Sequence, residues 1–214
     1  MIRIAVVGRG YMGTRHVDAL RGLPRAKVVR VVGRDGWEEV VSDPAVDAVV
    51  VATPTTSHHA VVTRALEEGK HVLCETPLAE TAQAARATER AARSSGKLLQ
   101  VALLGRFEHP GPRLRRAVAE EQVGRLRALT LRRFAPGTSG VHHGDALLEL
   151  MLFDLDALRA TGLPACVTAC GVVRGPTGRI DHATVLLDAG GALVTVEASY
   201  LVPKGHAFRV EYEA

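Results

Sequence analysis

Three glycines near the beginning of the chain have the spacing of a dinucleotide-binding loop. Gly8, Gly10 and Gly13 form the pattern GxGxxG, directly after the apolar run IRIAVV and directly before a helical pattern. Such glycines permit a tight turn, let the backbone approach a pyrophosphate and let the helix pack closely on its strand, while the helix N-terminus attracts negative charge. A glycine-rich turn without a ligand is the alternative, but the position between strand and helix favours dinucleotide binding.

The end of the second strand bears on which dinucleotide binds. A carboxylate about 20 residues after the fingerprint would bind the ribose 2′-hydroxyl of NAD. Here position 33 is glycine, and Arg34 and Asp35 follow it. An arginine beside a strand tip that lacks a carboxylate leaves room and a charge partner for a 2′-phosphate. We therefore expect NADP to be preferred over NAD. In the alternative, Arg34 is a solvated loop residue and Asp35 takes the place of the acid.

The first half of the chain alternates strand and helix patterns. Short runs rich in β-branched residues (IRIAVVG, KVVRVVG, DAVVVAT, HVLCE and KLLQVALL) are continuous rather than alternating, which is typical of buried parallel strands. Helical patterns lie between them, and Gly69 and Gly96 are typical helix stops. Residues 1–100 are therefore predicted to form a Rossmann dinucleotide-binding domain of the α/β class, with a doubly wound parallel sheet.

A different pattern begins after this domain. A turn and a helix (LGRFEHPGPRLRRAVAEEQVG) lead into an alternating strand, RALTLRRF, and a Gly/His-rich loop precedes the helical pattern ALLELMLFDLDALRATG. Strand patterns joined by Gly-rich turns complete the chain. We expect residues 101–214 to form an α+β domain with a mostly antiparallel open sheet, for substrate binding or oligomerisation.

The composition argues against several classes of protein. The net charge is +4, but the arginines are dispersed and aromatic residues make up only 4%, so no nucleic-acid partner is expected. No apolar run reaches the ~18 residues of a spanning helix, and the start MIRIAVVG is typical of a strand rather than of a signal peptide. Cys74, Cys166 and Cys170 form no disulfide framework or zinc spacing. These features predict a cytoplasmic protein with no metal site and no membrane partner.

Several segments together resemble one enzyme family. They are GRGYMGTRHVDAL, DPAVDAVVVATPTTSHHAV, ALEEGKHVLCETPLAET, LLGRFEHPGPRLRRAV with VGRLRALTLRRF, and ALLELMLFDLDALRATG. These segments extend over nearly the whole chain, which is similar to the Gfo/Idh/MocA family of NAD(P)-dependent oxidoreductases. The resemblance implies hydride transfer between the nicotinamide and a small carbonyl or alcohol substrate, such as a sugar or cyclitol. It also implies a homo-oligomer formed through the open sheet of the second domain.

The resemblance assigns further residues to the cofactor. They are Tyr11 and Met12 in the fingerprint, Thr53, Pro54 and His58 in a TPxxxH turn, and Glu75 and Pro77 in the loop where the family has EKP. Tyr11 would cover the pyrophosphate, although it and His16 are most simply packing residues of the first helix. His58 would lie beside the cofactor, and a packing role is an equal alternative.

The chain departs from the family where proton transfer is expected. Family enzymes commonly use the EKP lysine and the Asp and His of a DxxxH motif on a later helix, and these positions are Thr76, Glu149 and Phe153 here. Phe153 cannot carry a proton, whereas Glu149, four residues earlier on the same helix face, is ionisable. Thr76 can still donate a hydrogen bond through its hydroxyl. His143, in the loop before this helix, is the third catalytic candidate or a solvated loop residue.

Two kinds of function stay open. One is an oxidoreductase with altered acid–base groups, and the other is a non-catalytic NAD(P)-binding sensor or partner-binding protein. The segment RDGWEEVVSDPAVD is shorter than in the family, and the chain stops at FRVEYEA where family members commonly continue through several more strands. Both differences are expected to reduce the adenine side of the cofactor site and the second sheet.

Overall fold

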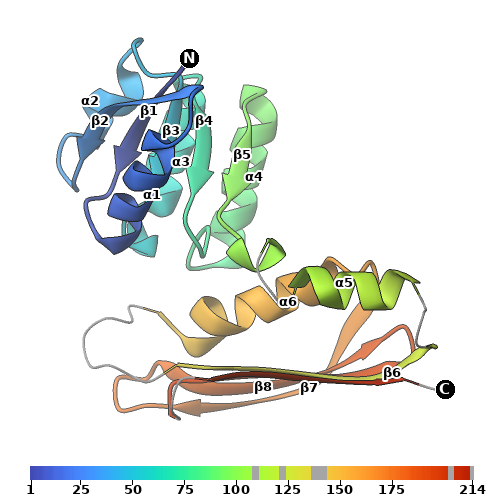
Figure 1. Ribbon diagram of the computed structural model, residues 1–214. Helices are drawn as coiled ribbons and strands as arrows, with labels where there is room; N and C mark the ends of the chain where they lie inside the picture. The colour runs from blue at the N-terminus through green and yellow to red at the C-terminus, as the bar shows by residue number, and fades with distance from the viewer. Residues whose placement is uncertain (108–110, 121–123, 136–143, 202–204, 213–214) are drawn as a thin grey trace. The chain divides into compact units, whose positions relative to one another are not determined.

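The computed structural model of the protein describes residues 1–107, 111–120, 124–135, 144–201 and 205–212 (Figure 1). The chain divides into two compact units, Met1–Ala102 (unit 1) and Leu103–Ala214 (unit 2). Each unit has its own sheet and its own hydrophobic core. Among the residues described, none of the helices combines the length and the apolar character that a membrane span needs.

Unit 1 is a parallel sheet with helices on both faces. Its elements are β1 (Ile2–Val7), α1 (Tyr11–Arg21), β2 (Ala26–Val32), α2 (Trp37–Ser42), β3 (Ala48–Val51), α3 (Thr55–Glu67), β4 (His71–Cys74), α4 (Ala82–Ser95) and β5 (Leu99–Val101). The strand order is β2-β1-β3-β4-β5, and every pair is parallel. The order reverses between β1 and β3, so ligands are expected at the carboxyl ends of these strands. The predicted doubly wound sheet is confirmed.

The two faces of this sheet bury different side chains. Val6 of β1 packs with Val17 of α1 on one face. Val7 packs on the other face with Val61 of α3 and with residues of α2 and α4. Because both faces are covered, neighbouring strand positions are apolar alike, which explains the continuous valine runs of the sequence.

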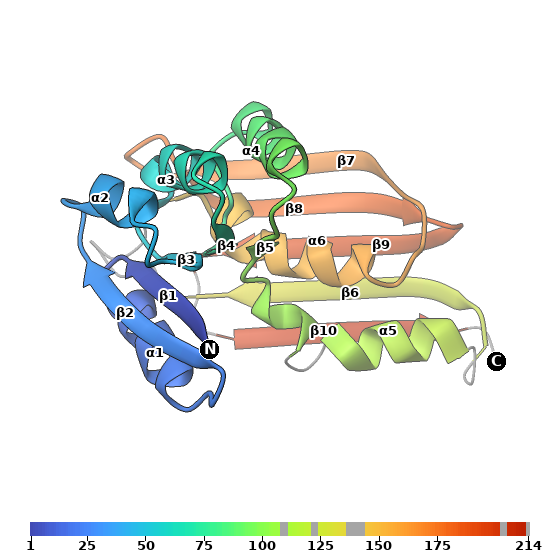
Figure 2. The ribbon, with the colours of Figure 1, turned by 90° about the horizontal axis from the view of Figure 1, so that it is seen from above.

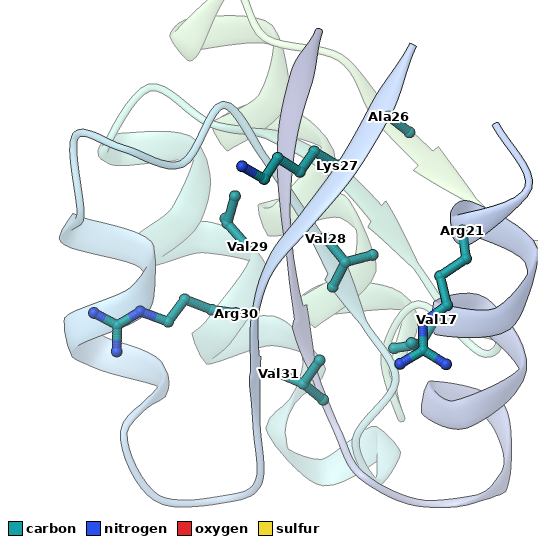
Figure 3. Close-up of a pocket in the computed structure, with 8 residues that line it drawn as sticks. All are labelled: Val17, Arg21, Ala26, Lys27, Val28, Val29, Arg30 and Val31. Carbon is teal, nitrogen blue, oxygen red and sulfur yellow. The ribbon is translucent and has the colours of Figure 1, made fainter. Parts of the chain in front are cut away.

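Strand β2 forms one edge of the sheet. It pairs with β1 alone among the described strands, and a groove of about 410 Å³ runs beside it. Figure 3 shows Val28 on the same side of β2 as Val17 of α1, whereas Lys27 and Arg30 extend to the other side. Charged side chains on an edge strand disfavour pairing with a strand of another chain. The groove therefore lies along an edge of the sheet that carries charged side chains.

Unit 2 is a mixed, mostly antiparallel sheet with helices on one face. Its elements are η1 (Leu104–Arg106), α5 (Gly111–Glu120), β6 (Leu126–Phe134), η2 (Leu147–Met151), α6 (Leu152–Arg159), β7 (Ala165–Arg174), β8 (Ile180–Ala189), β9 (Ala192–Ser199) and β10 (Gly205–Tyr212). Figure 2 shows the strands side by side in the order β10-β6-β9-β8-β7, in which β6 and β9 are parallel and the other pairs are antiparallel. The predicted α+β architecture is confirmed.

The core of unit 2 lies between this sheet and its helices. Alternate residues of the strands, such as Leu129 of β6 and Val194 of β9, pack against Met151 and Leu158 of the η2–α6 segment. Their neighbours point to the opposite, open face, where Arg132 of β6 lies 2.9 Å from Glu197 of β9. The alternation of buried and exposed positions is the pattern expected for an antiparallel sheet with one covered face.

Candidate active site

The glycine loop after β1 has a backbone shape that side chains would prevent. Gly8 has a φ of +124°, and a Cβ there would lie 2.2 Å from Ala52 O. A Cβ on Gly13 would lie 2.0 Å from Gly8 O, so the first turn of α1 packs directly on the loop. Gly10, in contrast, has open space where a Cβ would stand. The loop is thus closed on its inner side and bare on its outer side.

Helix α1 begins at this bare surface, and no side chain of its own cap or first turn offsets the partial positive charge of the helix start. No side chain caps the helix, and its first turn contains no acidic residue. The first backbone N–H groups of a helix have no intrahelical acceptor and carry a partial positive charge. A pyrophosphate over Gly10 would satisfy them, so the residues present fit a dinucleotide.

Tyr11 and Met12, which follow Gly10, differ in their surroundings. The Tyr11 side chain is 76% exposed and its ring lies 5.9 Å from the guanidinium carbon of Arg15. The interpretation of Tyr11 as a packing residue is therefore wrong, because its ring is exposed on the surface and does not pack in the core. Met12 is half-buried. Contact of either residue with the cofactor stays a prediction.

Two arginines lie at the carboxyl end of β2. Arg34 is exposed, directly after Gly33. The Arg9 guanidinium donates a hydrogen bond of 3.0 Å to Val31 O, and the Arg9 side chain would be the nearest neighbour of a Cβ on Gly33. Arg9 was not predicted from the sequence, although its place as the first variable residue of the fingerprint sets it beside the end of β2. The Arg9 guanidinium thus lies beside the strand tip where NAD-binding folds carry a carboxylate, and the exposed Arg34 follows that tip in the chain.

His58 ties together the loops that follow β3 and β4. Its Nδ1 lies 2.8 Å from Pro77 O and its Nε2 lies 2.8 Å from Thr53 O, and the side chain is only 1% exposed. The Thr53 hydroxyl accepts a hydrogen bond of 2.8 Å from Ser57, in the first turn of α3 behind Pro54. A ring so enclosed is a positioning group and does not touch a ligand. Of the two interpretations of His58, the structure favours packing.

Glu75, at the end of β4, makes a short contact with a histidine that the sequence did not reveal. One of its oxygens lies 2.6 Å from Nε2 of His16, on α1, and both side chains are largely buried. The next residue, Thr76, is half-buried, precedes a cis peptide bond to Pro77, and has a hydroxyl without a hydrogen-bond partner in the part of the chain that the structure describes. The pair joins the glycine-loop helix to the loop in which the family carries its lysine.

In unit 2, Glu149 is held by a tyrosine. The Tyr200 hydroxyl donates a hydrogen bond of 2.7 Å to Oε2 of Glu149. Burial, and then the carboxylate itself, raise the pKa of Tyr200 well above its ordinary value, so the hydroxyl stays protonated and keeps donating. The other oxygen, Oε1, would be 2.7 Å from a Cβ on Gly144, which therefore leaves room for the carboxylate. Tyr200 was not predicted from the sequence, because nothing at a strand end indicates a partner 51 residues away.

Phe153 lies beside a buried ion pair. The guanidinium carbon of Arg133 is 5.2 Å from the centre of the Phe153 ring, and the guanidinium contacts both oxygens of Asp154, at 2.9 and 3.1 Å. Asp154 is only 6% exposed, so this ion pair is buried. Glu149 belongs to a π-helical turn, η2, and Phe153 to the α-helix that follows. A π-turn holds more residues than an α-turn, so the premise of one regular helix face also fails here.

His143 lies outside the described residues, and its catalytic role stays a prediction. Arg106, in the segment LLGRFEHPGPRLRRAV, forms a two-pronged contact of 2.7 Å with each oxygen of Asp156. The sequence-predicted residues Thr53, His58, Glu75 and Pro77 are brought together in unit 1. Glu149 belongs to unit 2.

Comparison with known proteins agrees with these features. Residues 2–103 match the family model described as "Oxidoreductase family, NAD-binding Rossmann fold", of Gfo/Idh/MocA proteins. The chain is 30% identical over 239 residues to an inositol 2-dehydrogenase of Rhodococcus erythropolis, covering 99% of this chain and 68% of that protein. It is 28% identical over 242 residues to scyllo-inositol 2-dehydrogenase (NAD(+)) of Bacillus subtilis, covering 98% of this chain and 70% of that protein.

The fold is also shared with solved structures. KijD10, a 3-ketoreductase from Actinomadura kijaniata solved with TDP-benzene and NADP, superposes with a TM-score of 0.87. The alignment covers 99% of this chain and 73% of that chain at 21% identity. At this identity the likeness concerns the fold alone.

Proposed function

Because the chain belongs to the Gfo/Idh/MocA family of NAD(P)-dependent oxidoreductases, we propose that it interconverts a secondary alcohol and a ketone on a small polyhydroxylated substrate, a cyclitol or sugar. The likeness to two inositol dehydrogenases supports this substrate class. The observation that carries the cofactor assignment is the uncapped start of α1 over the bare Gly10.

The cofactor would be held by backbone and by arginine. The loop Gly8–Gly13 and the first N–H groups of α1 would bind the pyrophosphate, and Tyr11 would cover it. Arg9 lies beside the tip of β2 and the exposed Arg34 follows it, and a 2′-phosphate bound there would make charge-assisted hydrogen bonds with them. We therefore propose NADP as the preferred cofactor. When bound, the nicotinamide accepts or supplies the hydride.

Glu149 would act as the general acid–base residue. Oxidation of a secondary alcohol removes a hydride from carbon and a proton from the hydroxyl oxygen, and the proton needs a base. Of the three positions where the family commonly has ionisable catalytic residues, only Glu149 is ionisable here. Its carboxylate would take the proton in oxidation and return it to the ketone oxygen in reduction. Tyr200 would keep that carboxylate in place, and the Thr76 hydroxyl would hydrogen-bond the substrate oxygen.

Two measurements on the purified chain test this proposal. NADPH and NADH are first titrated by their fluorescence, and we expect saturable binding of both with NADPH bound more tightly. A preference for NADH would overturn the role given to Arg34 and Arg9. Turnover is then measured with NADP and NAD against inositols, sugars and their ketones. Normal cofactor binding without turnover over the whole panel would overturn the enzymatic proposal.

That last result would favour the second candidate, a cofactor-binding sensor or partner-binding protein. The observation in its favour is the loss of a proton-carrying group at both Thr76 and Phe153. The first candidate is preferred because Glu149 retains a carboxylate with a fixed hydrogen-bond donor.

A further inference from the structure

A cavity of about 380 Å³ in unit 2 lies among η1, the start of α5 and the last turns of α6. The two helices lie side by side in the sheet's helical layer (Figure 1). The cavity walls carry three arginines, Arg106, Arg115 and Arg159, and one acid, Asp156. No group of the proposed dehydrogenase chemistry takes part in it.

The charges of this cavity are not balanced by the protein. Asp156 is paired with Arg106 at 2.7 Å through both oxygens, and its side chain is only 10% exposed, so its charge is used within that pair. Arg115 and Arg159 come from different helices and are both exposed. Neither forms an ion pair within the ranges that the structure describes. Two positive charges are therefore left to face one concave surface.

The backbone adds to this field. Helix α5 begins at Gly111, which lines the cavity, and a helix start carries a partial positive charge. A Cβ on Gly111 would lie 2.1 Å from Gly105 O, so the start of the helix is packed directly against η1. No side chain of residue 111 fills the space that the arginines surround.

We infer that this arginine pocket (Arg106, Arg115 and Arg159) binds the phosphate group of a small phosphomonoester. A phosphomonoester carries close to two negative charges on one group at neutral pH, which matches the two uncompensated arginines. Guanidinium forks bind phosphate oxygens in pairs. The cavity volume falls within the range of small-molecule sites, so it accommodates a metabolite-sized body next to the phosphate.

The test measures phosphate binding by the full chain. Inorganic phosphate and glycerol 3-phosphate are titrated by calorimetry at constant ionic strength, with succinate as a dianion of different geometry. We expect saturable binding of both phosphate probes. The double variant Arg115→Ala/Arg159→Ala should weaken it at least about tenfold, since two charge-assisted contacts are lost. Both arginines are exposed, so unchanged thermal unfolding without phosphate is the check on folding.

Two control variants locate the binding. Arg113→Ala removes an exposed arginine of the same helix that does not line the cavity, and it should leave phosphate binding unchanged. Gly10→Ala alters the dinucleotide loop of unit 1 and should also leave it unchanged, which separates this site from the pyrophosphate site. Equal weakening by Arg113→Ala, loss through Gly10→Ala, succinate binding as tight as phosphate, or no saturable binding would each overturn the assignment.

Discussion

The glycine loop of unit 1 and the Glu149–Phe153 segment of unit 2 meet their functional requirements in different ways. The loop works through its backbone, since Gly8 and Gly13 are packed where no side chain fits and Gly10 is bare. The segment works through side chains, and these differ from the family pattern at Phe153 while the fold around them persists. The same family fold therefore keeps the glycine loop even where the groups for proton transfer have changed.

This difference has a physical cause. Glycines in contact with backbone atoms, such as Gly8 and Gly13, cannot change without moving the main chain, so folding itself fixes the shape of the loop. A side chain that carries a proton is needed for the reaction but not for packing. Phe153, for example, fills its place by lying against Arg133 and Gly105. Folding thus constrains the residues of the glycine loop, whereas the catalytic groups can be replaced without loss of the fold.

The largest effect is expected from alanine at two glycines of the loop. Gly13→Ala should lower the free energy of unfolding of unit 1 by about 3 kcal/mol, because the new Cβ would meet Gly8 O at 2.0 Å. Gly10→Ala should leave unfolding unchanged and weaken NADPH binding by about 100-fold, since its methyl group would occupy the place of the pyrophosphate. Urea unfolding and fluorescence titration measure the two effects.

A cysteine provides an independent readout for these variants. Cys74 is fully buried and burial raises the pKa of its thiol far above the ordinary value, whereas Cys166 and Cys170 are exposed. A thiol reagent should label two cysteines rapidly and Cys74 only when unit 1 opens. Gly13→Ala should speed the slow labelling and Gly10→Ala should not. Equal labelling rates in both variants would contradict the division between packing and binding glycines.

The second effect concerns proton transfer in unit 2. Glu149→Gln should lower kcat about 100-fold while NADPH binding is unchanged, because an amide cannot accept the substrate proton. Tyr200→Phe keeps the ring and removes only the hydroxyl that holds Glu149, so kcat should fall about tenfold with little change in KM. Steady-state kinetics with the best substrate of the panel measures both.

A purely structural role of Tyr200 would give a different outcome. In that case Tyr200→Phe would lower the unfolding midpoint and change kcat and KM together. A Glu149→Gln variant with the activity of the unchanged chain would remove Glu149 from the mechanism. His143 would then be the next residue to substitute.

A smaller effect should follow when family residues are restored. The double variant Thr76→Lys/Phe153→His should raise kcat about tenfold, because it supplies proton-carrying groups at two positions that lack them. The gain is limited by Arg133, whose charge lies 5.2 Å from the ring that is replaced. Thr76→Met/Phe153→Leu is the control, since it changes the same positions without adding such groups. Equal kcat values for the two double variants would show that these positions do not limit the reaction.

The sequence was sufficient for the fold and for the glycine loop. Valine-rich runs between helical patterns predicted the parallel sheet, and alternation predicted the antiparallel one, because each reports which faces of a strand are buried. The loop was equally readable, because GxGxxG places its glycines by local geometry alone. These features depend on neighbours in the chain.

The contacts of the candidate site depend instead on distant residues. His16 and Glu75 are 59 positions apart, and their contact exists only because the fold brings a side chain of α1 to the residue that follows β4. Glu149 and Tyr200 are 51 positions apart in the chain, and they meet where β9 ends. The π-helical turn before Phe153 was hidden as well, since an i, i+4 pattern assumes a regular α-helix. Such contacts become visible only once the elements are packed.

The smallest predicted effect lies at the end of the unit 1 sheet opposite the cofactor loop, and it tests whether stability and binding can be separated there. Asp47 accepts hydrogen bonds from the Arg3 guanidinium and from the Arg3 backbone N–H, at 2.7 to 3.0 Å, and these hold its pKa well below the ordinary range. A carboxyl whose pKa is lowered by folding stabilises the protein above its unfolded pKa of about 3.9, and this contribution disappears as pH falls through the lower, folded value. Asp47→Asn should therefore lower the urea midpoint slightly at pH 7. The difference from the unchanged chain should shrink as the pH falls below the pKa of an unfolded aspartate. NADPH affinity should stay the same, because the Arg3–Asp47 pair lies where β1 and β3 begin, whereas the glycine loop follows the end of β1. A parallel loss of affinity would mean that cofactor binding depends on the whole sheet and not on the glycines of the loop alone.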